Sequence, residues 1–127
     1  MGMPFSVALR SAVDRVRVVI LSGHSLFTEG IASRLREHSE RLDIQTIDPR
    51  NANVAEQVIA AQPLAVILDA SDPDAENHCS IGELLVALPW LKIIRLDPQQ
   101  SQVQIVTSER RTAGEVRDLI DLIESPQ

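Results

Sequence analysis

Short apolar runs alternate along the chain with segments in which apolar residues recur about every 3.6 positions. The short runs predict strands, and the periodic segments between them predict helices. This alternation is typical of βα units that build a mainly parallel sheet, so the pattern predicts an α/β fold. Five strands are predicted, at residues 17–21, 44–47, 65–68, 92–96 and 103–107.

Four periodic segments predict helices. The first begins near Ser25, a good capping residue, and the third ends before Pro89, which cannot continue a helix. The last helix is expected to open at Thr112, with Glu115 placed for a capping box. The apolar positions expected on the core-facing sides are Leu26, Phe27, Ile31 and Leu35, then Val54, Val58 and Ile59, then Ile81, Leu84, Leu85 and Leu88, and finally Val116, Leu119, Ile120 and Ile123.

The connection between the fourth and fifth predicted strands, residues 97–102, has only six residues. A parallel crossover needs a dozen or more residues, so this segment cannot make one. We therefore predict an antiparallel hairpin with Pro98 in its turn, which leaves the fifth strand at an open edge of the sheet. Such an edge must be covered, charged or used to recruit a partner strand.

No linker divides the chain, so we expect one domain at residues 16–124, preceded by an N-terminal arm at residues 1–15. The arm is the spare apolar segment of the chain, since it carries Phe5, Val7, Leu9 and Val13. We expect it to pack on the open edge, either within the chain or across a dimer.

Composition argues against several classes of function. Twelve Lys and Arg residues against eighteen Asp and Glu residues give a net charge of −6, which repels nucleic-acid and anionic-lipid phosphates. No apolar stretch approaches the roughly 20 residues that a membrane helix requires. We therefore expect no nucleic-acid partner and no membrane partner. The single cysteine, Cys79, and the absence of a secretion signal favour a cytoplasmic location.

Asp69 closes the most apolar predicted strand, where a carboxylate can accept a phosphoryl group or help to hold a divalent metal. Both tasks need further carboxylates, and the first strand ends instead at Ser22 and Gly23. Asp69 is therefore expected to be chemically quiet and hydrogen-bonded to nearby backbone or to a serine. The acidic stretch Asp69, Asp72, Asp74 and Glu76 lacks the glycine and terminal glutamate of an EF-hand, so we expect no metal site there.

The strand ends carry residues that could serve two other chemistries. The Ser22, Gly23, His24 and Ser25 segment precedes a helix, whose free N–H groups can hold a small anion. The segment has no nucleotide-binding glycine motif, and Ser25 is expected to serve as a plain helix cap. A catalytic triad drawn from Ser22, His24, His78 and Cys79 would need a nucleophile fixed beside its base, which the sequence does not provide. No enzymatic activity and no cofactor are expected.

Residues 16–31 read VRVVILSGHSLFTEGI and resemble the opening of a response-regulator receiver domain, of the kind that precedes helix-turn-helix outputs. Residues 63–73 read PLAVILDASDP and resemble the receiver's third strand, with Asp69 at the phospho-acceptor position and Pro73 at the proline that follows it. In element order the resemblance covers about residues 16–124. The first block matches the family most specifically at His24, Leu26, Phe27, Glu29 and Gly30.

The resemblance implies a flavodoxin-like (CheY-like) three-layer sandwich with strand order 2-1-3-4-5, here without the fourth helix and with an antiparallel fifth strand. It places the family's metal-binding acidic pair on Ser22 and Gly23, which supply no carboxylate. The family's switch hydroxyl falls on Asp97, and its lysine falls on Ser108 or Glu109. The resemblance therefore implies a pseudo-receiver with a degenerate metal site and a degenerate switch.

The expected function is that of a phosphorylation-independent module for protein interaction or regulation in two-component signal transduction. Its partner is expected to be a signalling protein or transcription regulator, or a second copy of the chain. Two alternatives stay open: a sensor that binds a small anion or metabolite at the strand-end crevice, and a residual phospho-acceptor at Asp69.

Overall fold

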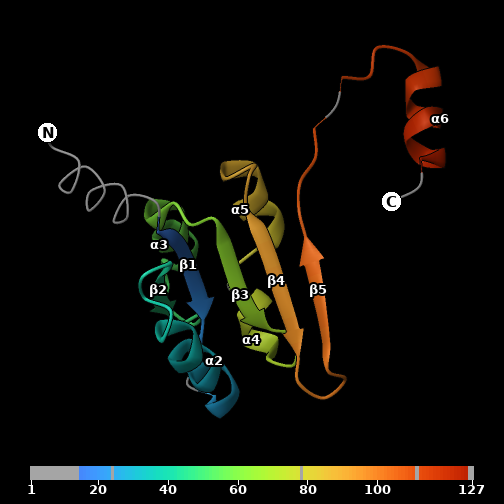
Figure 1. Cartoon of the computed structure of the whole chain (residues 1–127). Helices are drawn as coiled ribbons and strands as arrows, with labels where there is room; N and C mark the ends of the chain where they lie inside the picture. Colours follow the sequence, from blue (N-terminus) through green and yellow to red (C-terminus); the bar gives the residue numbers. More distant parts are fainter. Residues whose placement is uncertain (1–14, 24, 78, 111, 126–127) are drawn as a thin grey trace, which may run out of the picture.

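The computed structural model describes residues 15–23, 25–77, 79–110 and 112–125. Its centre is one mixed sheet in the order β2-β1-β3-β4-β5 (Figure 1). The first four strands are parallel, and β5 is antiparallel to β4. The strands are β1 (Val16–Leu21), β2 (Leu42–Ile47), β3 (Ala65–Asp69), β4 (Lys92–Asp97) and β5 (Gln102–Val106). The predicted α/β class, strand order and antiparallel fifth strand are confirmed.

Helices cover both faces of this sheet. On one face, α2 (Leu26–Arg36) packs over Val18 and Ile20 through Ala32. On the other face, α3 (Val54–Ala61) and α5 (Ile81–Ala87) pack over the alternate strand positions, including Val19 and Val66. Successive strand residues point to opposite faces, so the two clusters use neighbouring positions of the same strands.

Local sequence explains where these helices begin. The Ser25 hydroxyl accepts a hydrogen bond from the Thr28 N–H at 3.1 Å, which caps α2 as predicted. The Ser80 hydroxyl caps α5 in the same way, through the Glu83 N–H at 3.3 Å. A short helix that was not predicted, α4 (Pro73–Asn77), lies between β3 and α5. No helix lies between β4 and β5, where the described chain forms a turn.

The last helix departs from expectation. It is α6 (Val116–Glu124), and it begins after Glu115 rather than at Thr112. The Asp118 carboxylate accepts hydrogen bonds from the Gly114 and Glu115 N–H groups at 3.0 and 3.1 Å, which fixes the start of the helix at this later point. None of its residues is buried, because α6 lies clear of the sheet (Figure 1). The predicted burial of Val116, Leu119, Ile120 and Ile123 is therefore wrong for this structure.

Leu26 was also predicted on the core-facing side of its helix, and it is 90 % exposed. It is the first residue of α2, where the helix begins beyond the end of β1. The N-terminal arm and its expected packing fall almost entirely on residues 1–14, outside the residues that the structure describes.

Candidate functional site at the carboxyl edge of the sheet

The carboxyl ends of the four parallel strands meet at one edge of the sheet, which we call the carboxyl edge. Ser22 and Gly23 follow β1, and Asp48 follows β2. Asp69 is the last residue of β3, and Asp97 is the last residue of β4. The carboxyl edge therefore brings together most of the residues that the sequence singled out.

Asp69 is buried, with 5 % of its surface exposed. Its Oδ1 accepts two hydrogen bonds from Ser71, one from the N–H at 2.8 Å and one from the hydroxyl at 2.5 Å. The prediction that Asp69 bonds to nearby backbone and a serine is confirmed. Two hydrogen bonds donated to Oδ1 stabilise the negative charge of the carboxylate, which lowers its nucleophilicity.

The other aspartates of this edge make the same contact, in which a carboxylate accepts the N–H two residues later. Asp48 binds the Arg50 N–H at 2.9 Å, and Asp72 binds the Asp74 N–H at 3.0 Å. Asp97 binds the Gln99 N–H at 3.0 Å and the Gln100 N–H at 3.3 Å. These are Asx turns, which shape the loops that leave a strand. Sequence reasoning missed this shared role, although an aspartate at the end of three of the strands was its visible signal.

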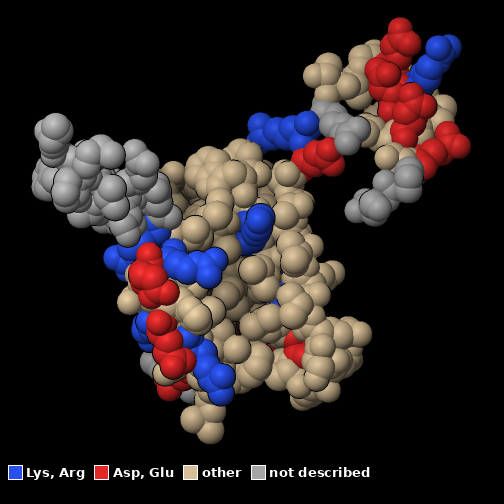
Figure 2. Space-filling model, in the orientation of Figure 1, with Lys and Arg blue, Asp and Glu red and all other residues tan. Residues whose placement is uncertain are grey.

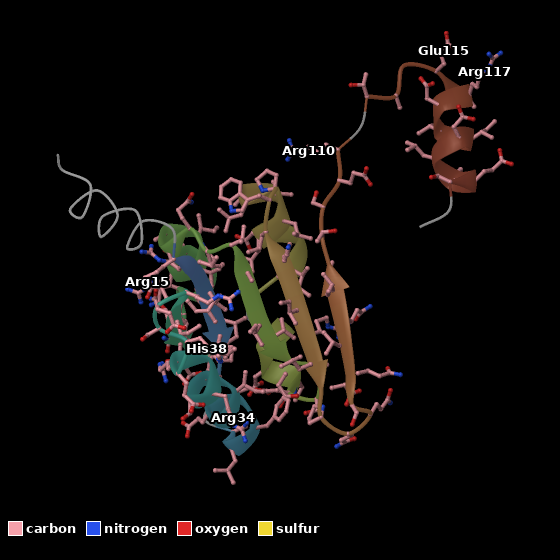
Figure 3. All side chains as sticks on the ribbon, viewed as in Figure 1. Arg15, Arg34, His38, Arg110, Glu115 and Arg117 are labelled. Carbon is pink, nitrogen blue, oxygen red and sulfur yellow. The ribbon has the colours of Figure 1, made fainter. Side chains whose placement is uncertain are left out.

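Asp97 stands at the switch position implied by the receiver resemblance, and its side chain forms the turn of the β4–β5 hairpin. Ser108 and Glu109, which the resemblance aligned with the family lysine, lie beyond β5. Because β5 is antiparallel, its last residue pairs with Ile93 near the start of β4, at the opposite edge from Asp69. Figure 3 shows Arg110 at that opposite end as well, so the segment 108–110 brings no cation to Asp69.

Ser22 and Ser25 are engaged within the fold. The Ser22 hydroxyl lies 2.8 Å from the Thr28 hydroxyl, and the Ser22 N–H donates to the Ile47 carbonyl at 3.0 Å. The Ser25 hydroxyl caps α2. His24, the remaining polar side chain of the proposed anion site, lies outside the described residues.

Gly23 packs close to a carboxylate. A Cβ at this position would lie 3.2 Å from Oδ2 of Asp72. A carboxylate beside the backbone of this loop repels a small anion at Gly23.

Arg50 brings a positive charge to this edge. Its guanidinium donates to both oxygens of Asp48, from Nε at 3.1 Å and from Nη2 at 3.0 Å. The hydrogen bond and charge of Asp48, with smaller contributions from Asp74 and Asp72, raise the pKa of Arg50 above its ordinary value. Arg50 thus offsets part of the negative charge that a metal ion would otherwise balance.

The donor set does not suit a divalent metal. Mg²⁺ is usually held by one or two carboxylates together with phosphate oxygens and water. Across the residues that the structure describes, no group of three or more His, Cys, Asp or Glu side chains converges in a metal-binding arrangement. Asp69 also has Ser22 and Gly23, rather than carboxylates, at the end of the neighbouring strand.

Cys79 belongs to the core and is 1 % exposed. Burial, followed by the charge of Glu83, raises the pKa of its thiol to about 11. The thiol is therefore protonated at neutral pH and is a poor nucleophile. The two histidines of the triad that the sequence disfavours, His24 and His78, lie outside the described residues.

No family model matches the chain, and neither the curated proteins nor the solved structures contain a significant match. Among the described residues, every helix is too short or too polar to span a lipid bilayer.

Proposed function

We propose that this chain is a pseudo-receiver, a flavodoxin-like domain of the CheY type that acts in the cytoplasm as a phosphorylation-independent module for protein interaction or regulation in signal transduction. The two sequence blocks at residues 16–31 and 63–73 support the receiver part of this proposal, as does the strand order β2-β1-β3-β4-β5. The expected partner is a signalling protein or a transcription regulator.

One observation carries the phosphorylation-independent part. Asp69 uses Oδ1 to bind Ser71, and the neighbouring strand ends in Ser22 and Gly23. Phosphoryl transfer to an aspartate requires a metal ion or equivalent positive charge to neutralise the transferred group. Among the residues that the structure describes, no cluster of metal-ligating side chains converges at Asp69, and its contacts with Ser71 make it a turn-forming residue.

A phosphodonor assay tests this part directly. The full chain is incubated with acetyl phosphate and Mg²⁺, and its intact mass is measured beside an active receiver domain as a positive control. We expect no phosphoryl group on this chain under conditions that label the control. A gain of one phosphoryl group that disappears in Asp69→Asn would contradict the proposal.

The interaction part needs a separate measurement. The wild-type chain and Asp69→Asn are used as baits in parallel pull-downs from native cells, with and without acetyl phosphate. We expect the same proteins in all samples, because binding does not depend on phosphorylation. A partner retained only by phosphodonor-treated wild type would show that Asp69 controls binding.

A further inference from the structure

The two faces of the β4–β5 hairpin differ sharply in polarity. On the α2 side, Ile94 pairs with Ile105, and Leu96 pairs with Val103. We call these four residues the apolar strip. Val103 and Ile105 are 60 % and 62 % exposed. In the view of Figure 1, β3, β4 and β5 have no helix in front of them, and Figure 2 shows few charged side chains over this region.

On the opposite face, Ile93 and Val106 at one end of the hairpin belong to the core on the α5 side, and the rest of the face, toward the turn, is polar. Arg95 pairs there with Gln104, to which its Nη1 donates a hydrogen bond at 2.5 Å, and Asp97 pairs with Gln102. This is the α5 side, where a receiver's fourth helix would lie. Polar side chains suit a part of the sheet that faces water, whereas the apolar strip has the composition of a face that packs against another element.

Helix α6 has an apolar face that could cover the apolar strip. Val116, Leu119, Ile120 and Ile123 recur at the spacing of one helix face, and each is between 48 % and 81 % exposed. We call these residues the α6 stripe. A helix of nine residues is marginal in water on its own, so α6 gains most of its stability from whatever covers this stripe.

The free edge of β5 is a third unsatisfied feature. Proteins usually protect an edge strand with charged residues, proline or a bulge. The sequence of β5, Gln-Val-Gln-Ile-Val, contains no charge and no proline, and it pairs with β4 without a bulge. Such an edge readily adds another strand.

We propose that the chain forms a two-fold symmetric dimer in which the β5 strands pair edge to edge and each α6 packs on the apolar strip of the other copy. A second copy supplies hydrogen-bond partners to the β5 edge and at the same time covers the apolar strip and the α6 stripe. If α6 instead closed on its own sheet, the β5 edge would stay open. The symmetric contact also closes on itself, which prevents the open-ended growth that such an edge otherwise allows.

The connection between β5 and α6 is long enough for this exchange. Residues 107–115 span up to about 30 Å when extended. Neighbouring strands lie about 4.8 Å apart, so the strip of the other copy begins one strand spacing away, at its β5, and ends at its β4, two spacings away. In Figure 3, Glu115 and Arg117 at the start of α6 already lie well away from their own sheet.

Site-directed cross-linking distinguishes exchange from closure within one chain. Ile105→Cys and Ile120→Cys chains are mixed, equilibrated and treated with a short bismaleimide. We expect a cross-linked species of two chains, one of each variant. The wild-type chain is the control, since its Cys79 is buried. A doubly substituted chain, carrying both cysteines, that cross-links only within itself would overturn the exchange.

Sedimentation equilibrium tests the dimer itself. Ile105→Lys and Ile120→Lys should each weaken dimerisation at least about 100-fold, because every dimer loses two buried isoleucines. Val86→Lys is the matched control: Val86 is 71 % exposed on α5, across the sheet from the strip, and its replacement should leave the dimer intact. A wild-type chain that is monomeric at high concentration would overturn the proposal.

This inference rests on the proposed interaction function and deepens it by naming a second copy as a partner. The dimer proposal and the proposed function would be contradicted by different measurements. A monomeric wild type would leave the pull-down and phosphodonor results untouched. Conversely, phosphorylation of Asp69 would leave the cross-link between residues 105 and 120 as it was.

Discussion

The carboxyl edge and the β5–α6 region differ in whether their side chains find partners within the chain. At the carboxyl edge, Asp48, Asp69, Asp72 and Asp97 each accept a backbone N–H within their own loop. In the β5–α6 region, Val103 and Ile105 of the apolar strip and all four residues of the α6 stripe are exposed. The carboxylates of the first region find hydrogen-bond partners within the chain, whereas the apolar side chains of the second region remain in contact with water.

This difference indicates where binding free energy is available. A ligand at the carboxyl edge would have to compete with hydrogen bonds that already shape the loops, and it would gain little in exchange. A partner that covers the strip and the stripe would bury apolar surface, worth about 25 cal/mol for each Å² removed from water. Association through the hairpin is therefore favoured over chemistry at the strand ends.

The largest effect that we expect concerns Cys79, which is buried in the core, unlike the exposed residues of the α6 stripe. Folding raises the pKa of its thiol from 9.0 to about 11, chiefly by burial, so the folded state favours the protonated form. The resulting stabilisation is present below pH 9 and is lost as the pH rises from about 9 to about 11. It amounts to at most about 3 kcal/mol of unfolding free energy, at 1.36 kcal/mol per unit.

Urea melts of wild type and Cys79→Ala across this pH range measure the effect. The stability of Cys79→Ala should fall less steeply than that of wild type between pH 9 and 11, whatever its absolute value at pH 7. If the unfolding free energies of wild type and Cys79→Ala changed in parallel with pH, the pKa of the thiol would not be raised on folding, and Cys79 would be accessible to water.

The second prediction concerns the Asp69 turn. Asp69→Ala removes the acceptor of the Ser71 N–H and hydroxyl, which should lower the unfolding free energy by about 1–3 kcal/mol. Asp69→Asn keeps an acceptor oxygen, so it should change the stability by no more than about 1 kcal/mol. Denaturant melts of the two variants give the comparison. If Asp69→Asn lowered the unfolding free energy as much as Asp69→Ala, the negative charge of Asp69 would have to stabilise the fold through interactions other than those with Ser71.

Much of the fold was predictable because it follows from local rules. The period of the apolar residues predicted the strands and most helices, and the short connection at residues 97–102 predicted the antiparallel β5. The Ser71 contact of Asp69 was predictable for the same reason, since its partner lies two residues away.

The remaining features depend on long-range geometry. The periodicity of α6 predicts that its stripe needs a cover, but it does not specify which surface provides that cover. The proximity of Gly23 to Asp72 depends on how two loops meet in space, 49 positions apart in the sequence. The turn role of Asp97 was missed because the receiver resemblance drew attention to its position as a switch rather than to the two N–H groups that follow it.

The smallest expected effect concerns the hairpin turn, where the two regions meet. Asp97 anchors one end of this turn, and Ser101 at the other end adopts a φ of 52°, in the left-handed region that favours glycine. Ser101→Gly should raise the unfolding free energy by about 1 kcal/mol or less, because relief of this strain exceeds the added freedom of the unfolded chain. Urea melts measure this change, with Ser101→Ala as the control that keeps the strain. Dimerisation should be unaffected, since the substitution leaves the apolar strip unchanged. A loss of stability in Ser101→Gly, or a weaker dimer, would show that the Ser101 side chain takes part in contacts that bind the turn to its surroundings.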